Sequence, residues 1–292
     1  MGVRVALILN SRSGSVGDPD ALVARIREAT DSLSVHDPGE GTAAAATHPD
    51  RIVVAGGDGS IGDAFAAAAG ARIPLAVIPA GTANDFARAL ELPEDRDEAI
   101  ALAVDPDATL QPTWGGRLDG RPFVNAASVG LAVDAAERAD ELKRRLGPLA
   151  YAAGALQAGI VGRSVDADLT VDDHLELGGK VYQLLIGASG RFGGGSGLGE
   201  ADPEVPQLVA AWVPATSRLE LPMRAIGLRR QTLEQQPGVR WWRAHRLAVN
   251  ATVGGRAATW NLDGEVWRPP PGPTIAEPLG PVNVAVPSAP AG

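Results

Sequence analysis

Residues 51–60 read RIVVAGGDGS, a short apolar run that ends directly in a glycine-rich turn. The run is bounded by turn residues and is too short for a typical helix, so it predicts a buried strand over Arg51–Ala55. The alanine-rich residues Ile61–Gly70 predict the helix that follows. Glycines in such a turn let the backbone approach a ligand closely, and their amides form a phosphate cradle with the helix N-terminus. The stretch therefore predicts an α/β unit with a parallel sheet.

A second turn of this kind lies in residues 79–88, PAGTANDFAR. It connects a predicted strand, Pro74–Ile78, to a predicted helix, Asn84–Leu90. Upstream, Val3–Leu9 predicts another buried strand and Ala21–Ala29 a helix with one apolar face. Open α/β sheets bind ligands at the carboxyl ends of their strands, so we expect both glycine turns at that edge.

Asp58, in the middle of GGDGS, would repel a phosphate on its own. It fits a phosphate site if it holds Mg²⁺ or accepts a proton from an attacking hydroxyl. A plain strand-to-helix turn is the alternative for this motif taken alone. The same segment also contains the spacing G-x-G-x-x-G, but the next strand ends in Pro79-Ala80-Gly81, without the acid that binds a ribose in dinucleotide-binding folds. That absence disfavours an oxidoreductase, and no Walker A pattern is present either.

Composition narrows the function classes further. The 292 residues include no cysteine and only four histidines, which excludes thiolate catalysis and cysteine-ligated metals. A net charge of -9 argues against a general nucleic-acid binder. The apolar run near the N-terminus is too short for a signal peptide, and Gly147–Gly162 is shorter than the roughly 20 residues of a membrane span. We expect a cytoplasmic protein whose contact with the inner face of the membrane is peripheral.

From about Pro112 the sequence becomes rich in β-branched runs separated by glycine and proline. Val181–Ala188, Val209–Val213 and Leu247–Val253 predict strands of a mostly antiparallel domain, interrupted by a helical segment over Ala132–Gly162. The tail ends in a strand-like run, Val282–Val286. The arginine- and tryptophan-rich residues 224–246 fit either an anionic membrane surface or a solvated helix and strand with partly packed tryptophans.

GGDGS followed by PAGTANDFAR resembles the diacylglycerol kinase catalytic domain, which bacterial lipid kinases, sphingosine kinases and ceramide kinases share. Further segments resemble the same family: NSRSG at 10–14, residues 123–130, residues 142–151 and Asp263-Gly264-Glu265. The resemblance implies an α/β plus all-β fold. An N-terminal three-layer α/β nucleotide-binding domain of the NAD kinase and diacylglycerol kinase type would span 1–115, and a β-sandwich domain for substrate or lipid would span 116–269. The tail, about 270–292, would pack back on the first domain.

The resemblance also implies roles for individual residues and the cofactors ATP and Mg²⁺. The implied catalytic residues are Asp58, Asp263 and Glu265, of which Asp58 and Glu265 would bind the metal. The implied nucleotide-binding residues are Asn10, Ser13, Gly56, Gly57, Gly59, Ser60, Gly81, Thr82 and Asn84. The implied substrate-binding residues are Asp85 and Asp134. A solvated β-turn is the alternative for Asp263-Gly264-Glu265 alone, and an acid at a helix start is the alternative for Asp134.

The sequence departs from the family in places. Ser11 replaces a common proline, Ser60 a threonine, and the Asp-Asp-Gly that anchors a structural Mg²⁺ in some bacterial relatives is missing around residues 204–208. The function expected is an ATP-dependent kinase of diacylglycerol or a related lipid. The alternatives are a kinase of a soluble hydroxyl compound and a catalytically silent nucleotide- or lipid-binding protein. The expected partner is a lipid at the membrane surface, with no nucleic acid, and a homodimer is left open.

Overall fold

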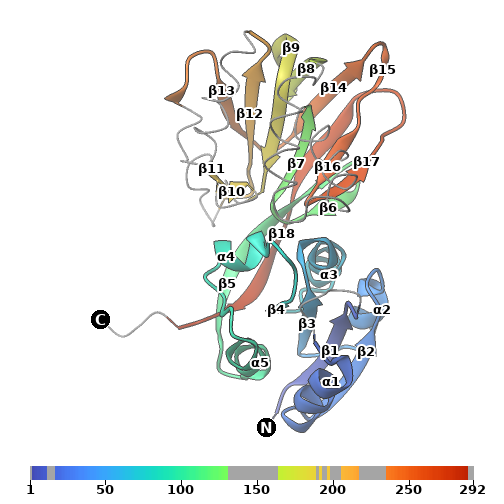
Figure 1. The fold of residues 1–292 in the computed structure, drawn as a ribbon, viewed down its shortest axis with the longest axis vertical. Helices are drawn as coiled ribbons and strands as arrows, with labels where there is room; N and C mark the ends of the chain where they lie inside the picture. The colour runs from blue at the N-terminus through green and yellow to red at the C-terminus, as the bar shows by residue number, and fades with distance from the viewer. Residues whose placement is uncertain are drawn as a thin grey trace, which may run out of the picture. The chain divides into compact units, whose positions relative to one another are not determined.

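The computed structural model describes residues 2–11, 17–130, 164–188, 191–192, 196–197, 205–216 and 235–288 (Figure 1). The chain divides into two compact units, Met1–Gly115 with Leu279–Gly292, and Gly116–Pro278. The return to the first unit thus begins at Leu279, nine residues beyond the point near 270 expected from the sequence. In the described part of the chain no helix is both long and apolar enough to cross a membrane.

The first unit is built on a parallel sheet with the strand order β2-β1-β3-β4, to which the end of β18 is added beside β4. Its strands are β1 (Arg4–Leu9), β2 (Ser32–His36), β3 (Arg51–Gly56) and β4 (Leu75–Pro79). Its helices are α1 (Pro19–Glu28), α2 (Gly41–Ala46), α3 (Asp58–Ala71), α4 (Asp85–Ala89) and α5 (Arg96–Val104). The predicted strands at 3–9, 51–55 and 74–78 correspond to β1, β3 and β4, whereas β2, α2 and α5 were not predicted from the sequence.

Helices cover both faces of this sheet, which gives the unit three layers. Alternate strand residues such as Leu7 and Val53 share one core cluster with Leu22 and Ile26 of α1 and Ile100 of α5. On the other side α3 packs on β3, and α2 packs on α3 and β1. The buried residues of α3 include Ile61, Ala64, Phe65 and Ala68, whose 3- and 4-residue spacing defines one helix face.

Helix α3 begins inside the glycine motif, three residues earlier than the sequence suggested. Gly57 takes an extended conformation, with φ -97° and ψ -176°, and serves as the N-cap. Asp58, Gly59 and Ser60 therefore form the first turn of the helix, and the Ser60 amide donates to the Gly57 carbonyl at 2.9 Å. The motif is the junction between β3 and α3.

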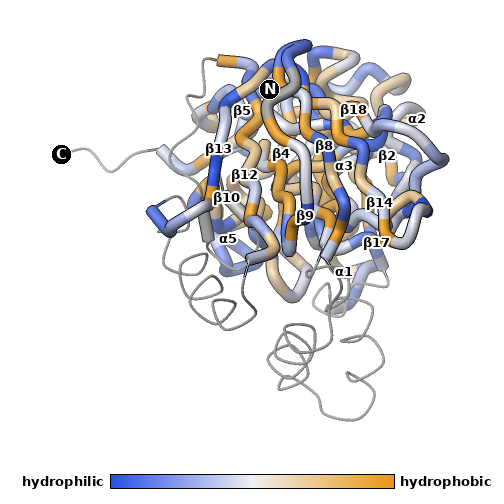
Figure 2. The backbone as a smooth tube through the Cα atoms, turned by 90° about the horizontal axis from the view of Figure 1, so that it is seen from above, coloured by the Kyte–Doolittle hydropathy of each residue, from blue (hydrophilic) through white to orange (hydrophobic). Residues whose placement is uncertain are grey.

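The second unit is mostly antiparallel, as predicted. Its strands are β5 (Thr109–Leu118), β6 (Arg121–Phe123), β7 (Ala126–Gly130), β8 (Val165–Val171), β9 (His174–Gly187), β10 (Arg191–Phe192), β11 (Ser196–Gly197), β12 (Leu208–Pro214), β13 (Arg240–Ala244), β14 (Leu247–Val253), β15 (Arg256–Ala257), β16 (Trp260–Leu262), β17 (Glu265–Trp267) and β18 (Thr274–Val286), with β5 and β18 continuing into the first unit. The strand order is β17-β16-β7-β9-β8-β14-β18. Outside this order, β12 pairs with β9 on one side and with β13 on the other. One large apolar cluster contains Phe123, Leu169 and Trp260, and apolar residues dominate the long central strands in Figure 2. The helical segment predicted over 132–162 lies outside the described residues.

Two-residue turns connect neighbouring strands of this unit. Asp119-Gly120, Asp172-Asp173, Gly254-Gly255 and Asp263-Gly264 join β5–β6, β8–β9, β14–β15 and β16–β17. All eight residues have positive φ, between +45° and +96°. Tight hairpins favour this geometry because it matches the twist of the strands, and glycine and aspartate adopt it at low cost.

Candidate active site

The two glycine loops of the first unit touch each other at the carboxyl edge of the sheet. β3 and β4 are parallel neighbours, with Gly56 opposite Pro79, and the Ala80 amide donates to the Gly56 carbonyl at 2.9 Å. A Cβ atom placed on Gly81 would lie 2.6 Å from the Cα atom of Gly57. Real Cβ contacts are not this short, so glycine at these positions allows one loop to pack on the other. The sequence had attributed the requirement to a ligand, and the structure adds this internal cause.

Asn10 connects the end of β1 to the first turn of α3. Its backbone amide donates to the Ala55 carbonyl at 3.0 Å, and its side-chain amide donates to the Ser60 hydroxyl at 2.9 Å. Ser60 is buried, and a Cβ atom on Gly56 would lie 2.8 Å from its hydroxyl oxygen. Asn10, Gly56 and Ser60 are thus packed together beneath the loops, while Ser13 of the same loop lies outside the described residues.

Asp58 fixes the start of α4. One carboxylate oxygen accepts the Asp85 amide at 3.1 Å and the other accepts the Phe86 amide at 3.0 Å. The N-cap of α4, Asn84, makes no side-chain cap to its own helix, so Asp58 supplies that cap from the neighbouring loop. The positioning role could not be read from the sequence because 27 residues separate Asp58 from Asp85.

Asn84 shapes the second loop from within. Its φ of +49° is left-handed, a conformation that asparagine tolerates better than most residues. Its side-chain oxygen accepts the Gly81 amide at 2.8 Å, and its side-chain nitrogen donates to the Gly81 carbonyl at 3.1 Å. Thr82 and Ala83, enclosed between these contacts in the chain, remain exposed. The Asn84 side chain assigned to the nucleotide by sequence therefore holds the loop that presents Thr82.

The N-terminus of α3 differs from those of the other long helices of this unit. The carboxylates of Asp18 and Asp95 each accept two amides at the starts of α1 and α5. By contrast α3, with 14 residues, begins at Gly57 without a side-chain cap, and Gly59 in its first turn is exposed. The partial positive charge of a helix N-terminus favours an anion there, and phosphate is the anion that glycine-preceded helix starts commonly bind.

Asp263 lies in the second unit, in the hairpin turn between β16 and β17. Its carboxylate accepts the backbone amides of Val124 at 2.5 Å, Asn125 at 3.0 Å and Ala126 at 2.8 Å. The backbone amide of Asp263 donates to the Ala126 carbonyl at 3.0 Å, so the turn is joined to the start of β7. Glu265, two residues later, is the exposed first residue of β17.

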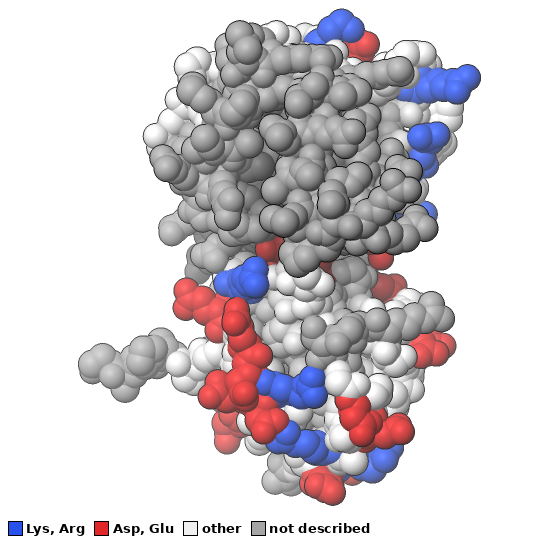
Figure 3. Space-filling model, in the orientation of Figure 1, with Lys and Arg blue, Asp and Glu red and all other residues white. Residues whose placement is uncertain are grey.

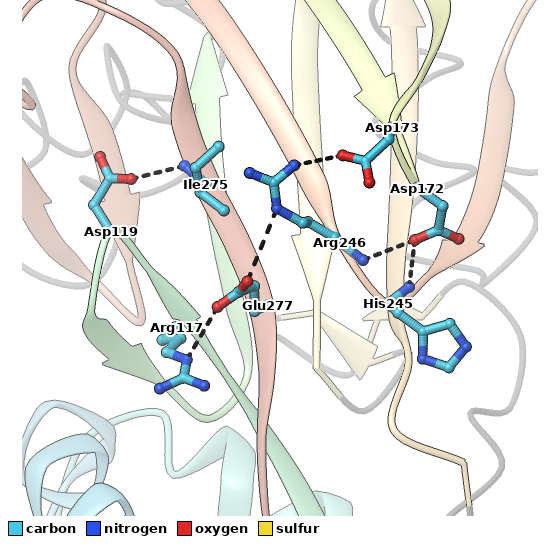
Figure 4. Close-up of polar contacts among 8 residues, drawn as sticks. All are labelled: Arg117, Asp119, Asp172, Asp173, His245, Arg246, Ile275 and Glu277. Atoms are coloured by element: carbon cyan, nitrogen blue, oxygen red, sulfur yellow. Dashed lines mark hydrogen bonds and ion pairs between the residues drawn. The ribbon is translucent and has the colours of Figure 1, made fainter.

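Two other hairpin aspartates use their carboxylates in the same way. Asp119 accepts the Ile275 amide at 2.7 Å, and Asp172 accepts the His245 and Arg246 amides at 3.0 and 2.9 Å (Figure 4). In each case the first residue of a two-residue turn bonds to the backbone of a segment that is distant in the sequence. Asp263 therefore has a structural role that it shares with these two residues, and its catalytic role stays a prediction.

The described residues include no group of three or more histidine and acidic side chains that could hold a metal ion by themselves. Phosphotransferases commonly bind Mg²⁺ through one or two carboxylates together with the phosphates of the substrate. Asp58 and Glu265, the residues predicted to bind the metal, lie in different units, and their role as ligands stays a prediction. Asp85 lies at the start of α4 with its amide on Asp58, and Asp134 is outside the described residues.

The clear pKa shifts of the first unit belong to residues at the opposite, amino ends of the strands. A side-chain hydrogen bond from Arg4 lowers the pKa of Asp50 to about 2, and the Arg4 backbone amide adds to the effect. Burial lowers the pKa of Arg51, whose guanidinium donates to the Ala103 and Asp105 carbonyls at 3.0 and 2.9 Å at the end of α5. Both shifts arise from contacts that hold the fold together.

The first unit is an α/β domain with two interlocked glycine loops at the carboxyl edge of a parallel sheet, the edge at which such sheets bind ligands. Residues 4–110 match the family model of the diacylglycerol kinase catalytic domain. The match confirms the resemblance of this part of the chain to that family, which the two motifs indicated.

Known proteins of the same kind extend the likeness beyond the first unit. A Staphylococcus epidermidis protein named "Diacylglycerol kinase" is 32% identical over 148 residues, which cover 50% of this chain and 46% of that protein. The chain thus matches about half the length of this curated relative. A Pseudomonas aeruginosa protein named "Probable lipid kinase YegS-like" is 32% identical over 202 residues, 66% of each chain. A crystal structure of a diacylglycerol kinase from Bacillus anthracis aligns over 99% of this chain and 98% of its own with a TM-score of 0.75 and 22% identity, which confirms the two-part fold.

Proposed function

We propose that the protein is an ATP-dependent lipid kinase, which transfers the γ-phosphate of Mg-ATP to a hydroxyl of diacylglycerol or a related lipid. The observation that carries the proposal is the uncapped N-terminus of α3 between two interlocked glycine loops. The match of residues 4–110 to the family model of the diacylglycerol kinase catalytic domain supports the same activity.

Phosphoryl transfer requires mainly positioning and charge stabilisation, and the first unit offers groups for both. Amides of the first turn of α3, with the exposed Gly59, and the hydroxyl of Thr82 bind the phosphates in this proposal. Asp58 orients α4, and it either accepts the proton of the attacking hydroxyl or helps to bind the cation. Asp58 and Glu265 would be the protein ligands of Mg²⁺ bound with ATP, and the ion would supply neutralisation of the charge that develops on the phosphates. The lipid is met at the inner face of the membrane.

The proposal is tested by ADP production from Mg-ATP with the purified full chain and a panel of micelle-dispersed lipids. The panel contains diacylglycerol, monoacylglycerol, a sphingoid base, ceramide and phosphatidylglycerol. Asp58→Asn is the inactive variant, and Asp63→Asn is its matched control. Asp63 lies on the same helix, and its carboxylate accepts one backbone amide, that of Gly41, at 2.8 Å.

We expect lipid-dependent turnover that is lost in Asp58→Asn and retained in Asp63→Asn. Turnover with a soluble polyol or nucleotide but with none of the lipids would replace the lipid acceptor by a soluble one. Binding of ATP without turnover on any acceptor would point instead to a silent scaffold and would end the kinase proposal.

A further inference from the structure

The edge strand β13 carries an unusual surface for so acidic a protein. Its sequence is RWWRA, and Arg240, Trp241 and Arg243 are exposed. In the described part of the chain β13 pairs only with β12, so it forms an edge of its sheet (Figure 1). Trp241 is 45% exposed, which makes it one of the most exposed large hydrophobic side chains among the described residues.

The two tryptophans of β13 have different surroundings. Trp242 packs against the large core cluster of the second unit and anchors the strand. Trp241 points to the other face, because successive strand residues alternate. The guanidinium carbon of Arg243 lies 5.8 Å from the centre of the Trp241 ring, within cation–π range. Trp241 and Arg243 thus form an exposed aromatic and cationic pair, which we call, together with Arg240, the Arg-Trp edge.

Among the described residues of the Arg-Trp edge and of β12, its partner strand, there is no acid. Residues 205–216 and 235–246, which include β12 and β13, have neither aspartate nor glutamate, although the chain as a whole has a net charge of -9. Arg246 at the end of this stretch is neutralised by Asp173 and Glu277, at 2.8 and 3.9 Å. Figure 2 shows β13 as hydrophilic because of its arginines.

A contrasting surface lies on the first unit around α4 and α5, where acidic side chains gather in Figure 3. Exposed acids of this region are Glu91, Glu94, Asp95, Asp97 and Glu98. An anionic surface would repel these groups and attract the Arg-Trp edge. Local charge, rather than net charge, therefore decides which part of the protein such a surface contacts.

We propose that the Arg-Trp edge docks the protein on an anionic lipid bilayer. Tryptophan is favoured at the headgroup level, where its ring is partly buried and its N–H stays hydrated. Arginine beside it is attracted by the negative potential of anionic lipids. The charged side chains also discourage pairing of this edge with a strand of another protein, the usual alternative fate of an exposed edge. This docking surface goes beyond the proposed kinase activity. Only the purpose of docking rests on that activity, since docking would bring the enzyme to its lipid.

The test is co-sedimentation of the full chain with vesicles of phosphatidylglycerol and phosphatidylcholine in equal parts, and with vesicles of phosphatidylcholine alone. We expect binding to the first kind only, weakened by added salt. Arg240→Gln should weaken the partition about fivefold, because each basic residue near an anionic surface contributes about that factor. Arg256→Gln, on the exposed strand β15, is the matched control with the same change of charge. Trp241→Ala should also weaken binding, with unfolding temperatures close to that of the unchanged protein.

A position-specific signal completes the experiment. Lipids brominated near the headgroup should quench part of the tryptophan fluorescence of the unchanged protein, and Trp241→Phe should remove most of the quenched part. Equal losses of binding in Arg240→Gln and Arg256→Gln, or quenching that survives Trp241→Phe, would overturn the assignment of the surface. Absence of binding by the unchanged protein would overturn it as well.

Turnover on micelle-dispersed lipid separates this inference from the kinase proposal. The Arg240 and Trp241 variants should keep that turnover while they lose vesicle binding. Vesicle binding by a protein without any turnover would contradict the proposed function and leave the docking surface intact.

Discussion

Replacement of Asp58 by asparagine tests whether the acid in the glycine motif is part of the fold as well as of the chemistry. The carboxylate accepts two backbone amides at the start of α4, one on each oxygen. Asparagine keeps one acceptor and turns an NH₂ group toward the other amide. Loss of a hydrogen bond to a charged group costs about 1.5–3 kcal/mol. Loss of the negative charge at a helix start adds about 0.3–1 kcal/mol.

The expected destabilisation of Asp58→Asn is therefore about 2–4 kcal/mol. At about 2–4 °C per kcal/mol, the unfolding temperature should fall by roughly 5–15 °C. The unfolding temperature of Asp63→Asn should fall much less, because the asparagine oxygen can still accept the single amide of Gly41. Differential scanning calorimetry of the two variants gives this comparison directly.

Turnover measured well below both transitions then separates the chemical role from the structural one. If Asp58 also acts as a base or binds the cation, kcat should fall at least about 100-fold in the folded variant. An Asp58→Asn protein that unfolds at the same temperature as Asp63→Asn would refute the capping geometry. A folded variant with full turnover would refute the catalytic assignment and leave the cap.

Three further changes test separate parts of the structure. Gly81→Ala should destabilise the protein by about 1–3 kcal/mol, because its Cβ atom would overlap the opposite loop. Gly70→Ala, with open space around it, should instead stabilise α3 by about 0.5–1 kcal/mol. Urea unfolding compares the two variants. The Asp50 carboxyl should titrate near pH 2 in carbon NMR, and its pKa should move toward 3.8 in Arg4→Gln. Because the pKa is lowered in the folded protein, the contact of Asp50 with Arg4 stabilises the fold fully above about pH 4, and this stabilisation is lost as the pH falls through 2. An unchanged titration in Arg4→Gln would contradict this. Asp263→Asn should lower the unfolding temperature, since one side-chain oxygen cannot accept three amides; unchanged kcat in the folded variant would limit Asp263 to the turn.

The parts of the fold that the sequence predicted are those with a strong local signal. β1, β3 and β4 are buried apolar runs that end at turn residues, namely Asn10 after β1, Gly56 in β3 and Pro79 in β4, and parallel strands bring their ends to one edge. β2 was missed because it is an edge strand, half exposed and polar at Ser32 and Ser34. α5 was missed because its burial depends on β4, against which it packs, and its own apolar pattern is weak.

The contacts that shape the site could not be predicted in the same way. Asp58 contacts Asp85 and Phe86 only because β3 and β4 are neighbours. The sequence implied that these strands are neighbours, but it did not specify their register. Asn84 holds its loop by adopting a left-handed conformation, for which its residue type is permissive and not diagnostic. Motif recognition identified the residues, while their hydrogen-bond partners required the assembled sheet.

The two acids that a motif-based interpretation would place at the reaction centre both bind backbone amides. Asp58 receives two of them within the first unit and Asp263 three within the second. A carboxylate that accepts two or three backbone amides cannot rotate freely, so its oxygens keep fixed positions. Reorganisation of charged groups during phosphoryl transfer is costly, and fixed acceptors avoid that cost. In the proposed kinase, the amides that these acids bind for the fold would therefore also determine where a cation or an attacking hydroxyl can bind.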